Sequence, residues 1–164
     1  MNNSKSKHQQ RVEVFMHGSG QIVPDRPTVP DPKTCILRAR LILEEALETI
    51  HALGCEAFIY SSTLNTEAMN MDDIDVHFNS KIGFDMDEVC DGCADVSVVT
   101  IGTLSACGIP DKELLRLVDE NNLAKLTGEQ KHDENGKLIK PENHEPPDIT
   151  GFIASCYCKA IDKR

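Results

Sequence analysis

The apolar positions of the chain are spaced mainly for helices. Between Ile36 and Leu53 they recur every three or four residues, which places them on one arc of a helix. Asp31-Pro32 before this run and Gly54 after it are typical start and stop signals. The pattern therefore predicts a long helix over about 34–53, and a shorter helix is predicted over 10–16.

A second apolar run, VSVVTIGTLSACGIP, follows Asp95 and carries no charge before Asp111. Its β-branched residues favour a strand by propensity alone. The run is longer than a usual strand, however, and its small residues permit close helix contacts. We therefore predict a buried central helix over about 85–107 and a further helix from 109 to about 125.

The remaining segments complete a predicted all-α fold with one insertion. GCEAFIYSS and DIDVHFNSKIG alternate like strands around a polar connection, which predicts a small β-hairpin-like insertion over 55–83. Residues 127–148 form a long polar loop with a turn signal at Asn135-Gly136. Residues 1–10 are polar and are expected to be flexible. ITGFIASCYCKAI closes the chain as a last packing segment.

Composition restricts the class of protein. A chain of 164 residues is enough for one domain, so we predict a single domain over 1–164. A net charge of −10 disfavours nonspecific binding to nucleic acid or to an anionic membrane. The absence of a secretory signal pattern and of a long apolar run predicts a soluble, cytoplasmic protein. The seven cysteines are then expected to be buried, reduced thiols.

A zinc site is the alternative interpretation of the cysteines. Cys90-x-x-Cys93 and Cys156-x-Cys158 together supply four thiolates, the ligand set of many structural zinc sites. Cys90 and Cys93, however, alternate with acidic residues on one predicted helix, and no second CxxC follows. The spacing therefore disfavours zinc.

Six carboxylates on the two long predicted helices are the main candidates for chemistry. On each helix the acidic side chains point in one direction, within about 60° of one another around the axis. Like charges packed this closely repel, so a cation is expected to neutralise them. Hard oxygen ligands suit Mg²⁺ and also Mn²⁺. The residues are Glu44, Glu45 and Glu48 on the first helix and Glu88, Asp91 and Asp95 on the second.

The plainer interpretation of the first set is a solvated helix face. Leu37 and Leu41 share the sector of the glutamates, however. A stripe that mixes leucines with acids indicates a helix covered on most sides, with its acids facing a cleft.

Five motifs in fixed order resemble the all-α nucleotide pyrophosphohydrolases of the MazG type, particularly the dUTPase-like bacterial and phage members. They are PDRPTVPD, RARLILEEALE, DGCADVSVVTIGTLSACGIP, NNLAK and NGKLIKPENHEPPDI, and they cover most of the chain. The resemblance implies a MazG-like helical bundle that forms an intertwined homodimer. It also implies hydrolysis of a nucleoside triphosphate to the monophosphate and pyrophosphate, with Mg²⁺ held by ExxE on one helix and ExxD on another.

The ExxE motif matches Glu45 and Glu48, with Glu44 beside them. The metal ions would neutralise the triphosphate and stabilise the leaving pyrophosphate. Glu44 or Glu45 is then a candidate for activating the attacking water. Similar proteins contact phosphates, or order the loop, through lysines that match Lys125 and Lys140. They contact the nucleotide through an asparagine that matches Asn122.

The ExxD motif matches less well. Asp95 aligns with the aspartate of the family, but Gly92 stands where the first acid is expected. We favour Asp95 together with Asp91, because residues at i and i+4 share a helix face, and we place Glu88 outside them. A match of ExxD to Glu88 and Asp91, one turn earlier, stays open.

These observations leave three functions in competition. The first is Mg²⁺-dependent cleansing of the nucleotide pool by hydrolysis of a (deoxy)nucleoside triphosphate such as dUTP or dCTP. The second is hydrolysis of phosphoribosyl-ATP, which uses the same chemistry. The third is a catalytically silent metal or nucleotide binder, which Gly92 in place of an acid would suggest.

Overall fold

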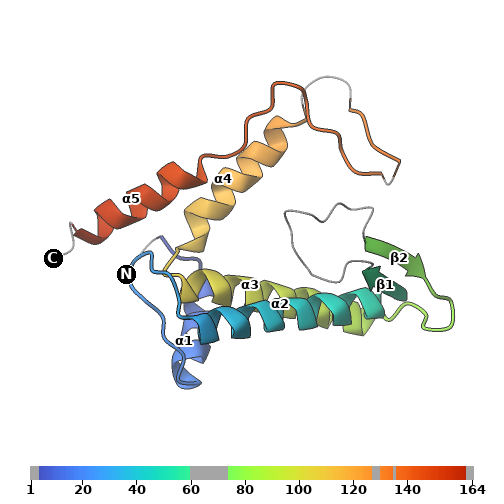
Figure 1. Cartoon of the computed structure of the whole chain (residues 1–164), viewed down its shortest axis with the longest axis horizontal. Coiled ribbons are helices and arrows are strands. Elements are labelled where there is room, and N and C mark those ends of the chain that lie inside the picture. Colours follow the sequence, from blue (N-terminus) through green and yellow to red (C-terminus); the bar gives the residue numbers. More distant parts are fainter. Residues whose placement is uncertain (1–3, 60–73, 127–129, 135, 162–164) are drawn as a thin grey trace. The chain divides into compact units, whose positions relative to one another are not determined.

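The computed structural model describes residues 4–59, 74–126, 130–134 and 136–161. In this part of the chain five helices and one two-stranded sheet form, which confirms the predicted all-α fold with a small hairpin (Figure 1). The chain divides into two compact units, residues 31–103 and residues 1–30 with 104–164. The single-domain organisation stays a prediction.

Helix α2, Pro32–Ala52, is the long amphipathic helix expected from the sequence. Asp31 caps it, because its carboxylate accepts hydrogen bonds from the amides of Lys33 and Thr34 at 2.9 and 3.2 Å. Pro32 occupies the first turn, where no amide donor is needed. Gly54 follows the helix at φ 76°, so the predicted stop signal is confirmed.

The predicted insertion is an antiparallel hairpin of β1, Cys55–Ile59, and β2, Ile74–Phe78. Cys55 pairs with Phe78 at the open end, and Ile59 pairs with Ile74 beside the connection. The connection itself, including Tyr60, lies outside the described residues. The Asn79 amide donates to the Gly54 carbonyl at 2.8 Å, which closes the base of the hairpin. The Asp85 amide, just before the next helix, donates to the Ala52 carbonyl at the end of α2 at 2.9 Å.

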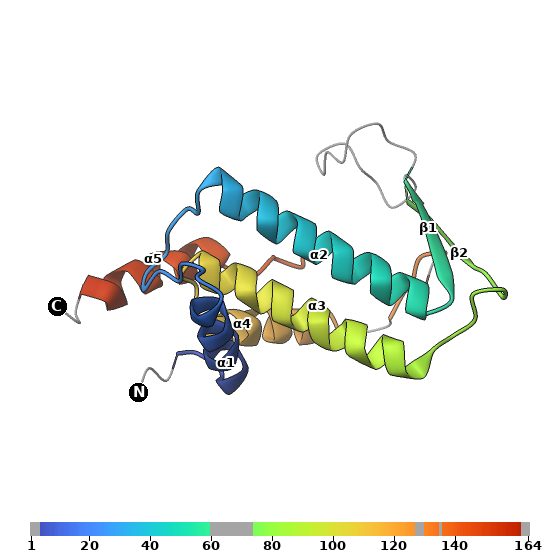
Figure 2. The ribbon, with the colours of Figure 1, turned by 90° about the horizontal axis from the view of Figure 1, so that it is seen from below.

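Helix α3, Met86–Ala106, confirms the central helix and overrides the strand propensity of its β-branched residues. It runs antiparallel to α2, and the two helices lie side by side (Figure 2). Its burial is one-sided: Val99 and Ile101 are buried, whereas Ser97 and Thr100 are exposed. The expectation that the whole apolar run is buried is therefore wrong for one face of the helix.

By length and composition, α3 is also apolar enough to cross a membrane. Its most apolar 18-residue stretch has a mean hydropathy of 1.3, and 28% of that stretch is buried within the protein. This corrects the expectation that no segment of the chain has this character. Core helices of soluble proteins meet the same criterion, so one such helix is weak evidence for a membrane span.

The other unit contains α1, Lys7–Gly18, α4, Asp111–Ala124, and α5, Ile149–Ile161. The last of these is the predicted closing segment, and it packs Phe152 and Cys156 against Ile109 in a small core. Partly buried side chains surround this core: Leu104, Cys107, Leu114, Leu117 and Ile153.

A buried polar network ties α1 to the start of α4. The fully buried Gln9 amide group donates to Ser105 Oγ at 3.1 Å and to the Ile109 carbonyl at 2.8 Å, and it accepts from the Asp111 amide at 2.9 Å. Asp111 in turn accepts from the backbone amide and the hydroxyl of Ser6, which caps α1. Because these bonds satisfy every group that they bury, they hold the chain in place from Ser6 onward.

The start of α1 corrects one sequence prediction. Within the segment 1–10 that was expected to be flexible, Lys5 pairs with Glu13 at 2.6 Å and α1 begins at Lys7. The first helix is accordingly longer than the predicted 10–16. The flexibility of residues 1–10 stays a prediction.

The seven cysteines form no disulfide. Cys156 is buried, and Cys55 and Cys107 are partly buried. The expectation of buried thiols is wrong for the other four, which are exposed: Cys35, Cys90, Cys93 and Cys158.

Candidate active site

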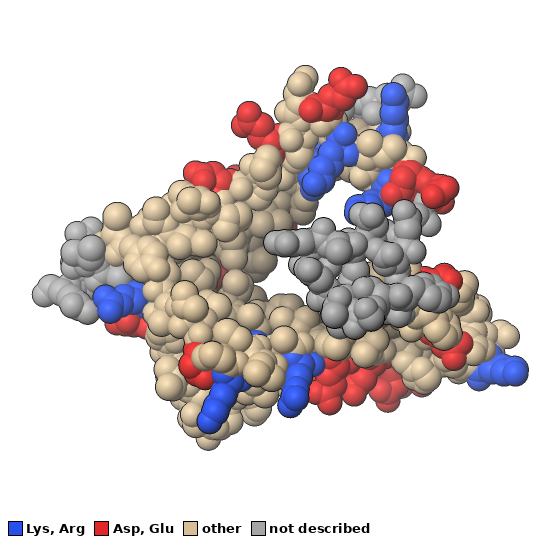
Figure 3. All heavy atoms as spheres, viewed as in Figure 1, with Lys and Arg blue, Asp and Glu red and all other residues tan. Residues whose placement is uncertain are grey.

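All six candidate carboxylates lie on α2 and α3, within one compact unit. Glu45 and Asp95 are half-buried, and the other four are exposed. Acidic side chains gather visibly over the α2 region of the molecule (Figure 3).

Gly92 of α3 lies directly against Thr49 of α2. Gly92 is buried, and a Cβ atom built on it would lie 2.5 Å from Thr49 Oγ1 and 3.3 Å from Thr49 Cα. Position 92 therefore faces α2 directly. An acidic side chain there would collide with α2, so the acid that the family pattern places at this position has no room in this chain.

Glu45 is the carboxylate most affected by its neighbours. Partial burial raises the pKa of Glu45, and the negative charge of Asp95 on the facing helix raises it further. Smaller contributions come from Glu48, Glu44 and Asp91, in that order. The acids of α3 that act on Glu45 are thus Asp95 and Asp91, which is the pair favoured from helical spacing.

Glu88 has a different local setting. It lies in the first turn of α3, where the Asp85 carboxylate accepts hydrogen bonds from the amides of Asp87 and Glu88 at 3.0 and 3.2 Å. A negative charge in a first helical turn is favourable because the helix dipole is positive there. Glu88 is not among the charges that raise the pKa of Glu45.

The carboxylates are suited to a hard divalent cation but do not enclose one. Within the described ranges, no three His, Cys, Asp or Glu side chains converge as a metal site. Glu45, Asp91 and Asp95 nevertheless supply only oxygen donors, and their mutual repulsion would be relieved by a cation between α2 and α3. The chemistry of the donor set therefore fits Mg²⁺ or Mn²⁺. The cysteines form no zinc cluster in the same ranges.

The raised pKa of Glu45 predicts a pH-dependent stability. Because its pKa is higher in the folded state than in the unfolded chain, ionised Glu45 destabilises the metal-free fold, and this penalty disappears as the pH falls through the folded-state pKa. In EDTA at neutral pH, Glu45→Gln is expected to raise the melting temperature by about 1–3 °C, a small gain because solvent screens the charges. This gain in melting temperature should vanish at acidic pH, because Glu45 of the wild-type protein is then protonated.

Melting curves recorded by circular dichroism across this pH range would measure the effect. The exposed Glu134 provides a matched control, since Glu134→Gln removes the same charge outside the carboxylate cluster. A Glu45→Gln variant that melts at or below the wild-type temperature at neutral pH would contradict the expected repulsion.

The candidate phosphate-binding residues lie in the other unit. Lys125 directly follows α4, and its Nζ donates to Asn122 Oδ1 at 2.6 Å, so the two share a helix face as expected. Asn122 and Lys140 are exposed, and Lys125 is half-buried.

Asn121 is a residue that the sequence analysis did not single out. Its Nδ2 donates to the Glu145 carbonyl at 2.7 Å, and its Oδ1 lies 3.0 Å from His144 Nε2. These contacts fasten the polar loop to α4, next to Asn122. The two consecutive asparagines of NNLAK are the sequence feature that could have pointed to Asn121.

From the sequence, Gly92 stands out only because an acid is expected at its position. An isolated glycine inside a helix, however, often marks a packing contact.

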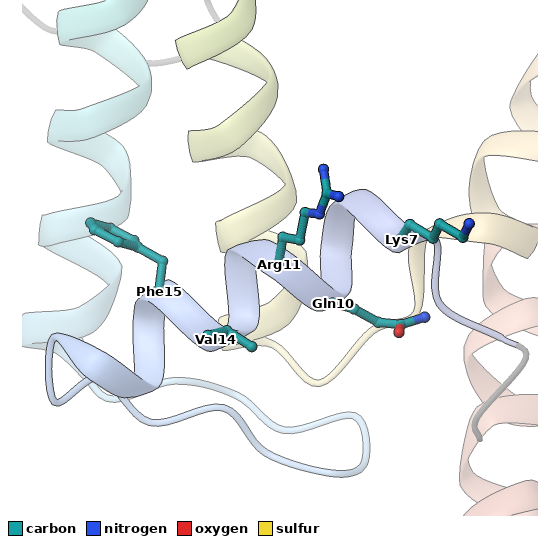
Figure 4. Close-up of a pocket in the computed structure, with 5 residues that line it drawn as sticks. All are labelled: Lys7, Gln10, Arg11, Val14 and Phe15. Atoms are coloured by element: carbon teal, nitrogen blue, oxygen red, sulfur yellow. The ribbon is translucent and has the colours of Figure 1, made fainter.

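One hollow of about 450 Å³ lies among the described residues of α1, and it contains none of the predicted site residues. Lys7, Gln10, Arg11, Val14 and Phe15 line it (Figure 4). The carboxylate cluster therefore remains the candidate active site on chemical grounds.

Comparison with known proteins identifies the family. The model of the family described as phosphoribosyl-ATP pyrophosphohydrolase matches residues 12–122, more than half of the chain. The match includes α2, the hairpin, α3 and nearly all of α4. No curated protein matches the chain. The chain belongs to the phosphoribosyl-ATP pyrophosphohydrolase family, a pyrophosphohydrolase family of the MazG-like all-α superfamily.

Proposed function

We propose that this protein is a Mg²⁺-dependent pyrophosphohydrolase that cleaves a (deoxy)nucleoside triphosphate between its α- and β-phosphates. The observation that carries the proposal is the placement of the carboxylates on α2 and α3, two helices of one unit that meet at Thr49 and Gly92. Oxygen ligands on two adjoining helices, in a chain of this family, match what the hydrolysis of a phosphoanhydride requires.

In this proposal Glu45, Glu48, Asp91 and Asp95 would hold the metal, and Mn²⁺ could replace Mg²⁺. The bound cation would supply neutralisation of the triphosphate and of the leaving pyrophosphate. Glu88 stays an outer candidate on α3.

The remaining steps fall to side chains of the protein. Glu45 or Glu44 would accept a proton from the attacking water. Lys125 and Lys140 stay proposed as contacts to the phosphates, and Asn122 stays proposed as a contact to the nucleotide. A lysine ammonium or an asparagine amide donates hydrogen bonds to phosphate oxygens, which offsets their charge.

The substrate is the open part of the proposal. A nucleoside triphosphate such as dUTP or dCTP is the first candidate, which would make the protein a nucleotide-pool cleansing enzyme. Phosphoribosyl-ATP is the second, because the matching family model is described by that substrate. Both carry the same scissile bond. A silent binder, the third possibility, is less favoured because Gly92 has a packing reason to replace an acid.

A substrate panel tests the proposal. The purified protein would be incubated with Mg²⁺ and the common dNTPs, NTPs or phosphoribosyl-ATP, and released pyrophosphate and orthophosphate would be measured separately. Pyrophosphate with equimolar nucleoside monophosphate is expected. Turnover of phosphoribosyl-ATP alone would select the second candidate, and no turnover of any substrate at any Mg²⁺ or Mn²⁺ concentration would refute an enzyme.

We also propose a cytoplasmic homodimer. Large apolar side chains of α2 are exposed in the single chain, for example Ile36 at 54% and Leu47 at 44%, and a second copy could cover them. Sedimentation equilibrium would measure the assembly, and a strictly monomeric protein at micromolar concentration would refute the dimer.

A further inference from the structure

We propose that Gly92 and Thr49 are positioning residues that set the distance between the carboxylates of α2 and those of α3. The inference rests on the proposed metal-dependent function and names what holds that site in register. Neither residue supplies an oxygen to the site in this view. They act by fixing how closely the two helix backbones approach.

The contact lies at the level of the carboxylates along both helices. Thr49 follows Glu48 directly and stands one turn after Glu45, while Gly92 follows Asp91 directly. Asp95 is one turn further along α3. Every proposed metal ligand is therefore within about one helical turn of the point where the helices touch.

The contact leaves no space for a side chain on α3. A methyl group at position 92 would lie 2.5 Å from Thr49 Oγ1 and 3.3 Å from both Cα and Cβ of Thr49. The hydroxyl is held in place, because Thr49 Oγ1 donates to the Glu45 carbonyl at 2.7 Å. The clash would therefore be relieved mainly by moving α3 away from α2.

A small displacement of α3 away from α2 would be enough to weaken metal binding by the carboxylates. Mg²⁺ demands near-octahedral geometry with oxygens at about 2.0–2.1 Å, and functional groups need to be held within about 0.5 Å of the productive arrangement. Glycine inside a helix costs about 1 kcal/mol relative to alanine, so its presence in α3 requires a compensating benefit. Close approach of the carboxylate-bearing helices is that benefit.

The test uses Mn²⁺ as a direct probe, measured by electron paramagnetic resonance of free and bound ion. Gly92→Ala is expected to weaken Mn²⁺ binding by about 10-fold or more, and to raise the Mg²⁺ concentration needed for half-maximal pyrophosphate release by a similar factor. Thr49→Ala added to Gly92→Ala should restore most of the affinity, because it removes the atom that lies at 2.5 Å. A merely destabilising change would not be rescued in this way.

Gly18→Ala is the matched control, since a Cβ on this helical glycine would meet nothing within 4 Å. If Gly92→Ala does not fold, the double variant is compared with Thr49→Ala alone, and about 3-fold weaker Mn²⁺ binding is expected from the remaining 3.3 Å contacts. Wild-type affinity in Gly92→Ala, or a double variant no better than Gly92→Ala, would overturn the inference.

The two proposals fail in different ways. A wild-type protein that binds Mn²⁺ but releases no pyrophosphate would refute the enzyme while leaving the positioning role measurable by binding. A wild-type protein that turns over substrate, with Gly92→Ala equal to it, would refute the positioning role alone. Absence of Mn²⁺ binding in the wild-type protein would refute both.

Discussion

Replacing Asp95 by asparagine is expected to lower kcat/KM for pyrophosphate release by about 100-fold to 1,000-fold, and Glu48→Gln is expected to have a similar effect. Each change removes an anionic oxygen from the proposed metal site while preserving the shape of the side chain. A bound metal contributes several kcal/mol of transition-state stabilisation, and each 1.36 kcal/mol corresponds to about tenfold in rate. Steady-state pyrophosphate release at saturating Mg²⁺ would measure the loss.

The helical content of both variants should stay at the wild-type level, because Asp95 and Glu48 lie on helix surfaces that are partly open to solvent. Asp25→Asn, a change of the same kind at an exposed loop residue, should keep full activity. An active Asp95→Asn variant would move the site toward Glu88 and Asp91, the alternative match of the ExxD motif.

Substitution of Gly108 by alanine is expected to be the most destabilising single change outside the site. Gly108 has φ of 69°, which costs a residue with a Cβ about 1–2 kcal/mol. That Cβ would also lie 2.0 Å from the Arg26 carbonyl oxygen and 2.6 Å from its carbon, so the backbone must move. Together with a typical overpacking cost of about 1–3 kcal/mol, the loss should be about 2–5 kcal/mol of the free energy of unfolding.

Gly108 is crowded because two chain segments meet there. It follows the end of α3, and the Thr28 amide donates to the Cys107 carbonyl at 2.9 Å, which holds residues 24–28 against it. Urea denaturation followed by circular dichroism would give the free energy of unfolding, and a variant too unstable to purify would agree with the upper end of the expected loss.

Gly20→Ala separates the two contributions in this prediction. Gly20 has a similar φ of 77°, but a Cβ there would meet nothing within 4 Å. It should lose only the conformational cost of about 1–2 kcal/mol. Equal losses for the two variants would show that the close approach to Arg26 contributes nothing.

Local signals in the sequence were enough to predict most of the secondary structure. The Asp31-Pro32 start and the Gly54 stop of α2 depend on bonds within a few residues, so they could be read directly from the chain. The same holds for the hairpin, whose alternating segments pair as expected. In α3, the length of the apolar run outweighed its β-branched composition.

Contacts between residues far apart in the sequence could not be predicted in this way. The placement of Ser6 and Gln9 depends on contacts with Ser105, Ile109 and Asp111, about a hundred residues away. No periodic pattern in MNNSKSKHQQ reports these partners, so the segment resembled a flexible end.

The candidate site shows the same division. The sequence alone determined that Glu45, Glu48, Asp91 and Asp95 lie on two helices with their acids grouped, because helical periodicity is a local property. Only the tertiary structure decided that Gly92 faces Thr49, where no acid fits. The physical reason is that the distance between two helices is set by the side chains packed between them, and a single glycine can determine it.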